Sequence, residues 1–174
     1  IEQAMDLNCD LICVINDDVL FAKNTLQGLC ESWIEKPADT VMVTGQNIRP
    51  EIQNPDDMLN YEINLNEPVI FGESPDFACF MISKETINLV GKFDENFIPA
   101  YFEDNDYHLR INKLGFRALS SSWAKYYHYG STTQNFDQTA PAVVPSQFDL
   151  NRQYYKDKWG GDIGQEIYFH PYNY

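Results

Sequence analysis

The chain has 174 residues, of which 44% are hydrophobic and 14% aromatic, and its formal net charge is -14 at pH 7. This length and composition favour one domain with a sizeable core. The acidic charge argues against a nucleic-acid or anionic-membrane surface, so we expect no nucleic-acid partner. We also expect no transmembrane segment, because no apolar run approaches the ~20 residues that cross a bilayer.

The apolar pattern predicts alternating helices and strands. Strands are expected at residues 11–16, 40–44, 77–83, 116–119 and 125–129, and helices at 1–7, 24–34, 84–90, 104–114 and 146–159. Residues 47–75 are rich in Asn, Pro, Asp and Glu and are expected to form a long loop with one short helix. This alternation predicts an α/β fold with a mainly parallel sheet.

Acidic residues follow the first predicted strand directly. Asn16, Asp17 and Asp18 end the apolar run LICVI. Carboxylates at the end of a buried strand suit a divalent cation that also binds phosphates, because such cations prefer hard oxygen ligands. The alternative is an Asp-rich turn or a helix cap without a ligand. We therefore regard Asn16, Asp17 and Asp18 together as candidates for binding a metal ion and a phosphorylated donor.

A second acidic group opens the predicted helix at 104–114. Glu103 and Asp104 follow the aromatic pair Tyr101-Phe102, and Asp106 lies two positions on. A positioned carboxylate can take the proton of an attacking hydroxyl, so Asp104 is a candidate general base and Glu103 its neighbour. The alternative is that these carboxylates only complement the helix dipole and cap the helix.

A histidine in an aromatic setting is the third candidate. His128 lies in YYHYGST at the end of the last predicted strand. Neutral imidazole can complete a metal shell begun by carboxylates, although a His among aromatic residues can also be structural. The four cysteines, Cys9, Cys13, Cys30 and Cys79, form no CxxC pair, which favours reduced thiols and a cytoplasmic location.

These pieces, in this order, resemble the inverting glycosyltransferases of family 2, which have the GT-A fold. The matching segments are VINDDV (14–19), FACFMIS before FDENF, YFEDNDYHLRINKLGFRA (101–118) and YYHYGST (126–132). The ending KWGGDIGQEIYFHPYN is similar to that of some small viral and bacterial members. The resemblance implies a GT-A-like three-layer sandwich that lacks its N-terminal nucleotide-binding strands. It implies one catalytic domain over 1–174, with 133–174 as a C-terminal extension.

The same resemblance implies roles for the candidate residues. Asp18 would bind Mn²⁺ or Mg²⁺, Asn16 would stand at the first acid of an Asp-x-Asp motif, Asp104 would be the base and His128 a second metal ligand. One sugar would move from a nucleotide-sugar donor to a hydroxyl of a glycan, lipid-linked or protein acceptor. The Gln-x-x-Arg-Trp motif of processive synthases is absent from the sequence, which favours single transfers.

Two other functions remain open at the level of sequence. A nucleotidyltransferase also uses a metal and acidic strand ends, although the chain contains no Gly-rich phosphate loop of either common type. A non-catalytic sugar-binding or structural module could retain the fold of a transferase without its activity. Extending the sequence and assaying nucleotide-sugar turnover would separate these possibilities.

Overall fold

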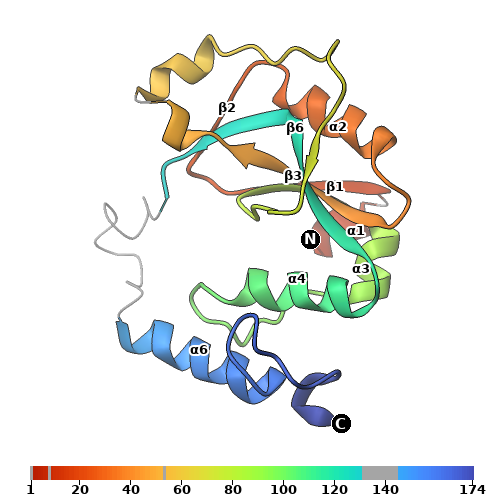
Figure 1. The fold of residues 1–174 in the computed structure, drawn as a ribbon, viewed down its shortest axis with the longest axis vertical. Coiled ribbons are helices and arrows are strands. Elements are labelled where there is room, and N and C mark those ends of the chain that lie inside the picture. The colour runs from red at the N-terminus through yellow and green to blue at the C-terminus, as the bar shows by residue number, and fades with distance from the viewer. Residues whose placement is uncertain (1, 8, 53, 131–144) are drawn as a thin grey trace.

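The computed structural model describes residues 2–7, 9–52, 54–130 and 145–174 (Figure 1). Residues 131–144 lie outside this part, and so does the first portion of the expected extension at 133–174. Within the described residues, no helix is both long and apolar enough to cross a membrane.

The chain has an α/β fold built on one mixed sheet. Its strands are β1 (Leu11–Ile15), β2 (Val19–Phe21), β3 (Thr40–Asn47), β4 (Phe71–Gly72), β5 (Cys79–Ser83) and β6 (Arg117–His128). Their order is β1-β5-β3-β6-β2, and β4 pairs with β6. The strands β3 and β6 run parallel, whereas the pairs β1–β5, β3–β5, β2–β6 and β4–β6 are antiparallel.

The expectation of a mainly parallel sheet is therefore wrong. An apolar run indicates that a strand is buried but not which way it runs. Direction depends on the connection, and a parallel neighbour needs a crossover back to the starting end of the sheet. The segment between β3 and β5 makes no such crossover. Its described residues form the short 3-10 helices η1 (Arg49–Glu51) and η2 (Pro55–Leu59) and strand β4, and the segment returns the chain antiparallel to β3.

The helices are close to those expected from the sequence. They are α1 (Glu2–Asp6), α2 (Thr25–Glu35), α3 (Lys84–Val90), α4 (Glu103–Lys113) and α6 (Pro145–Trp159), followed by the 3-10 helix η3 (Pro171–Asn173). Three differences concern strands: β2 and β4 were not expected, and β6 is one strand where two were expected. The serines between the two expected strands belong to β6, where Ser121 is buried and its hydroxyl lies 2.5 Å from that of Ser32 on α2.

Helices cover both faces of the sheet. On one face, Met42 and Ile82 pack with Ile87 of α3 and Ile111 of α4. The alternate positions of the same strands face Leu29 of α2. This alternation follows from the two-residue period of a strand, which sends neighbouring side chains to opposite faces. The first of these faces holds α4, which carries carboxylates at its N-terminus, against the sheet.

The C-terminal helix adds a further layer. Figure 1 shows α6 beneath α4, on the side away from the sheet. Tyr155 and Trp159 of α6 are each 1% exposed and pack against Phe97 and Phe102, which precede α4. The helix expected at 146–159 is therefore confirmed, and its apolar face fixes the segment that leads into α4.

Strand β1 differs from its expected environment. A strand buried on both faces was expected, yet β1 stands at one end of the strand order. Ile12 is 6% exposed, whereas Ile15 is 42% exposed and Cys13 is also exposed. An edge strand has a neighbour on one side only, so part of its apolar surface remains uncovered.

Candidate functional site

The structure brings Asp18 and His128 into direct contact. The Nε2 atom of His128 lies 2.9 Å from Oδ1 of Asp18, and the two side chains are 22% and 12% exposed. The residues are 110 positions apart in sequence, so the fold and not local structure creates the pair. The two expected metal ligands are therefore in contact, and their binding of a metal remains a prediction.

Pairing of two strands explains this contact. Val19 of β2 lies opposite His128 of β6, and the Tyr129 N–H continues the ladder by donating to the Asp18 carbonyl over 3.0 Å. The end of β6 is also held from β3, because the His128 N–H donates to the Asn47 side chain over 3.3 Å. Both groups are thus carried by paired backbone, which limits their freedom to separate.

Arg49 holds the same strand end from η1. Its guanidinium donates to the carbonyls of His128 and Tyr129, and it lies 5.8 Å from the centre of the Tyr127 ring. A cation near an otherwise acidic strand end lowers the electrostatic cost of gathering carboxylates there. Sequence reasoning did not identify Arg49, because its contacts cross from the connection after β3 to β6.

Asn16 and Asp17 lie beside this pair with exposed side chains. The Asn16 N–H donates to the Ala78 carbonyl over 2.8 Å, which extends the β1–β5 pairing beyond Ile15. The turn 16–18 therefore connects two strands that do not pair with each other. Its position fits the expected donor side, although no contact with another described residue assigns a role to either exposed side chain.

The geometry of Asp18 and His128 fits two ligands of one divalent ion. Two adjacent ligands at ~2.1 Å from an octahedral ion lie ~3 Å apart, close to the observed 2.9 Å. Neither around this pair nor at any other place do the described side chains gather three or more His, Cys, Asp or Glu that could hold a metal. The chain can thus supply two ligands here, and the remaining positions would be open to phosphate oxygens or water.

Two carboxylates at the start of α4 sit in a partly buried environment. Burial raises the pKa of Asp104, as does the charge of Asp76, while hydrogen bonds from backbone N–H groups and the charge of His108 lower it. Oδ1 of Asp104 accepts the Asn105 N–H over 2.7 Å. Burial and the charge of Asp104 likewise raise the pKa of Glu103. A carboxylate with a raised pKa is a stronger base, so both residues suit proton abstraction.

Glu103 is the second candidate for the general base. Its Oε2 atom is buried and has no hydrogen-bond partner among the residues that the structure describes. His108, one helical turn after Asp104, was not identified from the sequence, although an i, i+4 spacing on a helix could have pointed to it. Burial lowers the pKa of His108 against the charges of Asp104 and Glu73.

The backbone that leads into α4 is in a sparsely populated conformation. Tyr101 and Phe102 have φ angles of 79° and 75°, in the left-handed region that non-glycine residues rarely adopt. Asn151 of α6, which is 2% exposed, donates from its side chain to the carbonyls of Ala100 and Tyr101 over 2.8 and 3.3 Å. The helix α6 thereby holds the turn that aims Glu103 and Asp104.

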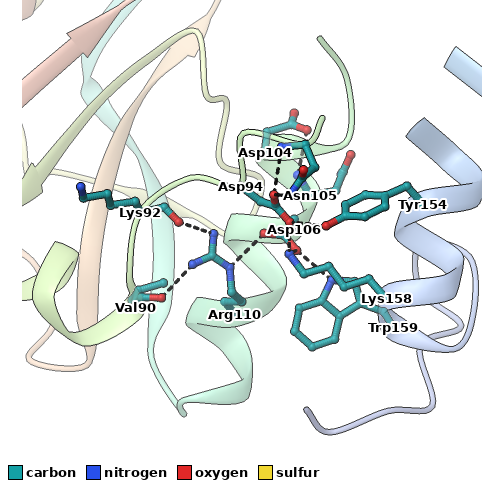
Figure 2. Close-up of polar contacts among 11 residues, drawn as sticks. Val90, Lys92, Asp94, Asp104, Asn105, Asp106, Arg110, Tyr154, Lys158 and Trp159 are labelled. Carbon is teal, nitrogen blue, oxygen red and sulfur yellow. Dashed lines mark hydrogen bonds and ion pairs between the residues drawn. The ribbon is translucent and has the colours of Figure 1, made fainter. Parts of the chain in front are cut away.

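Asp106 has a different environment from Asp104. It is 0% exposed and binds Arg110 Nε at 2.9 Å, Lys158 Nζ at 2.6 Å and Trp159 Nε1 at 2.9 Å. Figure 2 shows Lys158 and Trp159 reaching from α6 to this carboxylate on α4. The helix turn thus separates the carboxylates as expected: Asp106 joins two helices, and Asp104 is left for the candidate site.

The two halves of the site come from different layers but face the same side of the molecule. Figure 1 shows the end of β6 that carries His128 and the start of α4 on the same side. No hydrogen bond between described residues links the pair Asp18 and His128 directly to Asp104.

The connection between β3 and β5 forms a separate hollow. Its volume is about 340 Å³, and its lining includes Tyr61, Glu67, Trp123 and Lys125. Neither the Asp18–His128 pair nor Asp104 contributes to it.

Comparison with known proteins gives partial matches. No family model matches the chain. A galactofuranosyl glycosyltransferase of Leishmania donovani is 37% identical over 73 residues, which cover 41% of this chain and 17% of that protein. An uncharacterized protein of Sinorhizobium fredii is 27% identical over 82 residues, which cover 47% of this chain and 9% of that protein. The chain spans less than a fifth of each relative, so the similarity points to glycosyl transfer at most.

Proposed function

We propose that the protein is a metal-dependent inverting glycosyltransferase of the GT-A type, which transfers one sugar from a nucleotide-sugar to an acceptor hydroxyl. The contact between Asp18 and His128 carries this proposal, because two potential metal ligands from distant segments meet at 2.9 Å. The partial similarity to a galactofuranosyl glycosyltransferase supports the reaction class. It also makes a galactofuranose nucleotide the first donor to test.

The residues of the chain divide the chemistry between two sides of the site. Asp18 and His128 would hold Mn²⁺ or Mg²⁺, which when bound would neutralise the diphosphate of the departing nucleotide. The exposed turn at Asn16 and Asp17 would border the donor. A protonated His128 could not serve as a ligand, so the site requires the neutral imidazole.

Asp104 would act on the acceptor. As the acceptor oxygen forms its bond to the anomeric carbon, the bond from that carbon to the diphosphate oxygen breaks, and the nucleoside diphosphate leaves with the electron pair. The proton of the attacking hydroxyl passes to the Asp104 carboxylate. Attack from the face opposite the leaving group inverts the anomeric configuration. Glu103 would act as the base instead if the acceptor hydroxyl binds closer to Glu103 than to Asp104.

The test is turnover of a nucleotide-sugar panel that includes UDP-galactofuranose, measured with the full-length protein in Mn²⁺, Mg²⁺ or EDTA. We expect metal-dependent release of nucleoside diphosphate and a product of inverted configuration by NMR. Asp18→Ala should abolish the metal-dependent turnover while leaving the circular dichroism spectrum unchanged. Glu35→Ala, an exposed carboxylate at the end of α2, is the matched control and should retain full turnover.

The alternatives give different products. A nucleotidyltransferase would consume a sugar phosphate and a nucleoside triphosphate and release pyrophosphate, and would not form nucleoside diphosphate. A non-catalytic module would bind without turnover in every metal. Equal calorimetric Mn²⁺ affinity in wild type and Asp18→Ala would remove the metal assignment, even if some transfer activity remained.

A further inference from the structure

Two cysteines lie side by side on neighbouring strands of the sheet. Cys13 of β1 lies opposite Met81 of β5, and Ile15 lies opposite Cys79. Opposite residues of two antiparallel strands point to the same face, and so do residues two positions apart along one strand. Cys13 and Cys79 are therefore diagonal neighbours on one face of the sheet, and a hydrogen bond joins their thiols.

The two thiols differ in their access to solvent. Cys13 is exposed on the edge strand β1, whereas Cys79 is 0% exposed and packs with Leu29 of α2. Cys9 packs on the opposite face of the sheet, in the cluster that contains Ile12. The pair on β1 and β5 thus combines one thiol that a dissolved oxidant can reach with a second thiol that is shielded from it.

The hydrogen bond between the thiols gives them different reactivity. It lowers the pKa of Cys13, although burial opposes this, and so favours the thiolate, which is the form that reacts with peroxides. The same hydrogen bond raises the pKa of Cys79, together with burial and the charges of Cys13 and Asp76. Oxidation of Cys13 to a neutral sulfenic acid removes the charge of the Cys13 thiolate and its hydrogen bond. Cys79 then releases its proton more easily.

The position of β1 in the sheet allows the sulfur atoms to approach each other. Diagonal neighbours have Cα atoms ~7–8 Å apart, whereas a disulfide usually joins Cα atoms ~4.4–6.8 Å apart. Among the described strands, β1 pairs only with β5 and stands at the end of the strand order. It can therefore move by the ~1 Å that separates these two ranges without breaking a second set of strand pairs.

We propose that Cys13 and Cys79 form a peroxide-reactive thiol pair, which closes to a reversible disulfide between β1 and β5. The Cys13 thiolate attacks one oxygen of hydrogen peroxide, the O–O bond breaks, and hydroxide leaves while Cys13 becomes a sulfenic acid. The Cys79 sulfur then attacks the Cys13 sulfur, the S–O bond breaks, and water leaves with the proton of the Cys79 thiol. In total, two thiols lose two electrons and two protons, and one peroxide is reduced to two waters.

The test treats the reduced full-length protein with one molar equivalent of hydrogen peroxide, blocks the remaining thiols and digests the protein with endoproteinase Asp-N. This enzyme cuts before aspartate, so Cys13 and Cys79 fall in peptides 10–16 and 76–93, which contain neither Cys9 nor Cys30. We expect wild type to lose two free thiols, to remain a monomer and to give these two peptides joined by a disulfide in mass spectrometry. Dithiothreitol should restore both thiols.

Three variants assign the steps. Cys30→Ser replaces another exposed cysteine, so it is the matched control and should form the same disulfide as wild type. Cys13→Ser should form no disulfide and should keep Cys79 reduced. Cys79→Ala should leave Cys13 as a sulfenic acid that dimedone traps, and circular dichroism checks that this core variant folds. If it does not fold, Cys13→Ser decides the matter, because the side chain that it replaces is exposed.

Several results would overturn the inference. These are wild-type thiols that stay free, equal rates of oxidation for Cys13 and Cys30, or conversion of Cys13 to a sulfinic acid without a disulfide. A disulfide from Cys13 to Cys9, to Cys30 or to a second molecule would overturn it as well. None of these measurements uses turnover of a nucleotide-sugar, so their outcome does not depend on the proposed function.

Discussion

Replacing Asp106 by alanine should destabilise the fold strongly. The substitution removes a fully buried carboxylate that binds two cations and the indole N–H of Trp159. Truncating one partner of a buried ion pair costs about 3–5 kcal/mol when it strands the opposite charge. The environment of each partner decides where in this range the cost falls.

The two cations keep other partners after the substitution. Lys158 still binds Asp94 at 2.6 Å, and Arg110 still donates to the carbonyls of Val90 and Lys92 at 2.7 and 2.9 Å. The indole N–H is stranded, which costs about 1–3 kcal/mol because its ring is 1% exposed. We therefore expect the free energy of unfolding to fall by about 3 kcal/mol, the lower end of the range for a broken buried pair.

Urea unfolding followed by tryptophan fluorescence measures this change. With an m-value of ~2 kcal/mol/M, the midpoint should fall by ~1.5 M. The matched control is Glu95→Ala, an exposed carboxylate near Asp94, for which the change should stay within about 0.5 kcal/mol. If the free energy of unfolding of Asp106→Ala falls by less than about 1 kcal/mol, the buried ion pairs and hydrogen bonds of Asp106 make no net contribution to stability. The packing of Trp159 alone would then hold α6.

Further substitutions separate catalysis from stability. Asp104→Asn should cut turnover ~10²–10⁴-fold. The raised pKa of Asp104 means that the fold disfavours its charged form, so the Asp104→Asn variant should be as stable as wild type or more stable at pH 7. A denaturation curve of each protein checks this. In wild type, turnover should rise with pH through that raised pKa; a rate independent of pH would exclude Asp104 as base. Burial opposes ionisation of Asp94, but Lys158 and Asn96 hold its pKa at about 2, so Asp94→Ala should lose stability at pH 7 and little near pH 2. Gly28→Ala should destabilise by about 1–3 kcal/mol or more, because the added Cβ would lie 1.7 Å from the Trp123 carbonyl oxygen; unchanged thermal unfolding would contradict the close approach.

Capping residues and apolar spacing in the sequence predicted most of the helices. The helix expected at 84–90 has those bounds in the structure because Ser83 caps the Thr86 N–H and Gly91 follows with a φ of 89°. The meeting of Asp18 and His128 followed from motifs at strand ends. Features of this kind can be predicted because they depend on a short stretch of chain or on one edge of the sheet.

Features that depend on pairing between distant segments were not predictable in the same way. Strand β2 has three residues and is stabilised by β6, so no periodicity identified it. The direction of β5 depends on the path of a long connection. The role of Asp106 depends on a partner far along the chain, since Lys158 lies 52 positions away. A carboxylate in the sequence does not reveal whether its neighbours in space are cations, other carboxylates or water.

The half-covered strand β1 has a practical consequence for handling the protein. An apolar strand at the end of a sheet can pair with the same strand of another molecule, which leads to aggregation at the concentrations used for NMR and calorimetry. The exposed Cys13 thiol on that strand adds a route to covalent dimers under oxidising conditions. Buffers with a reducing agent, and a Cys13→Lys variant that places a charge on the exposed face, should keep the protein monodisperse in light scattering.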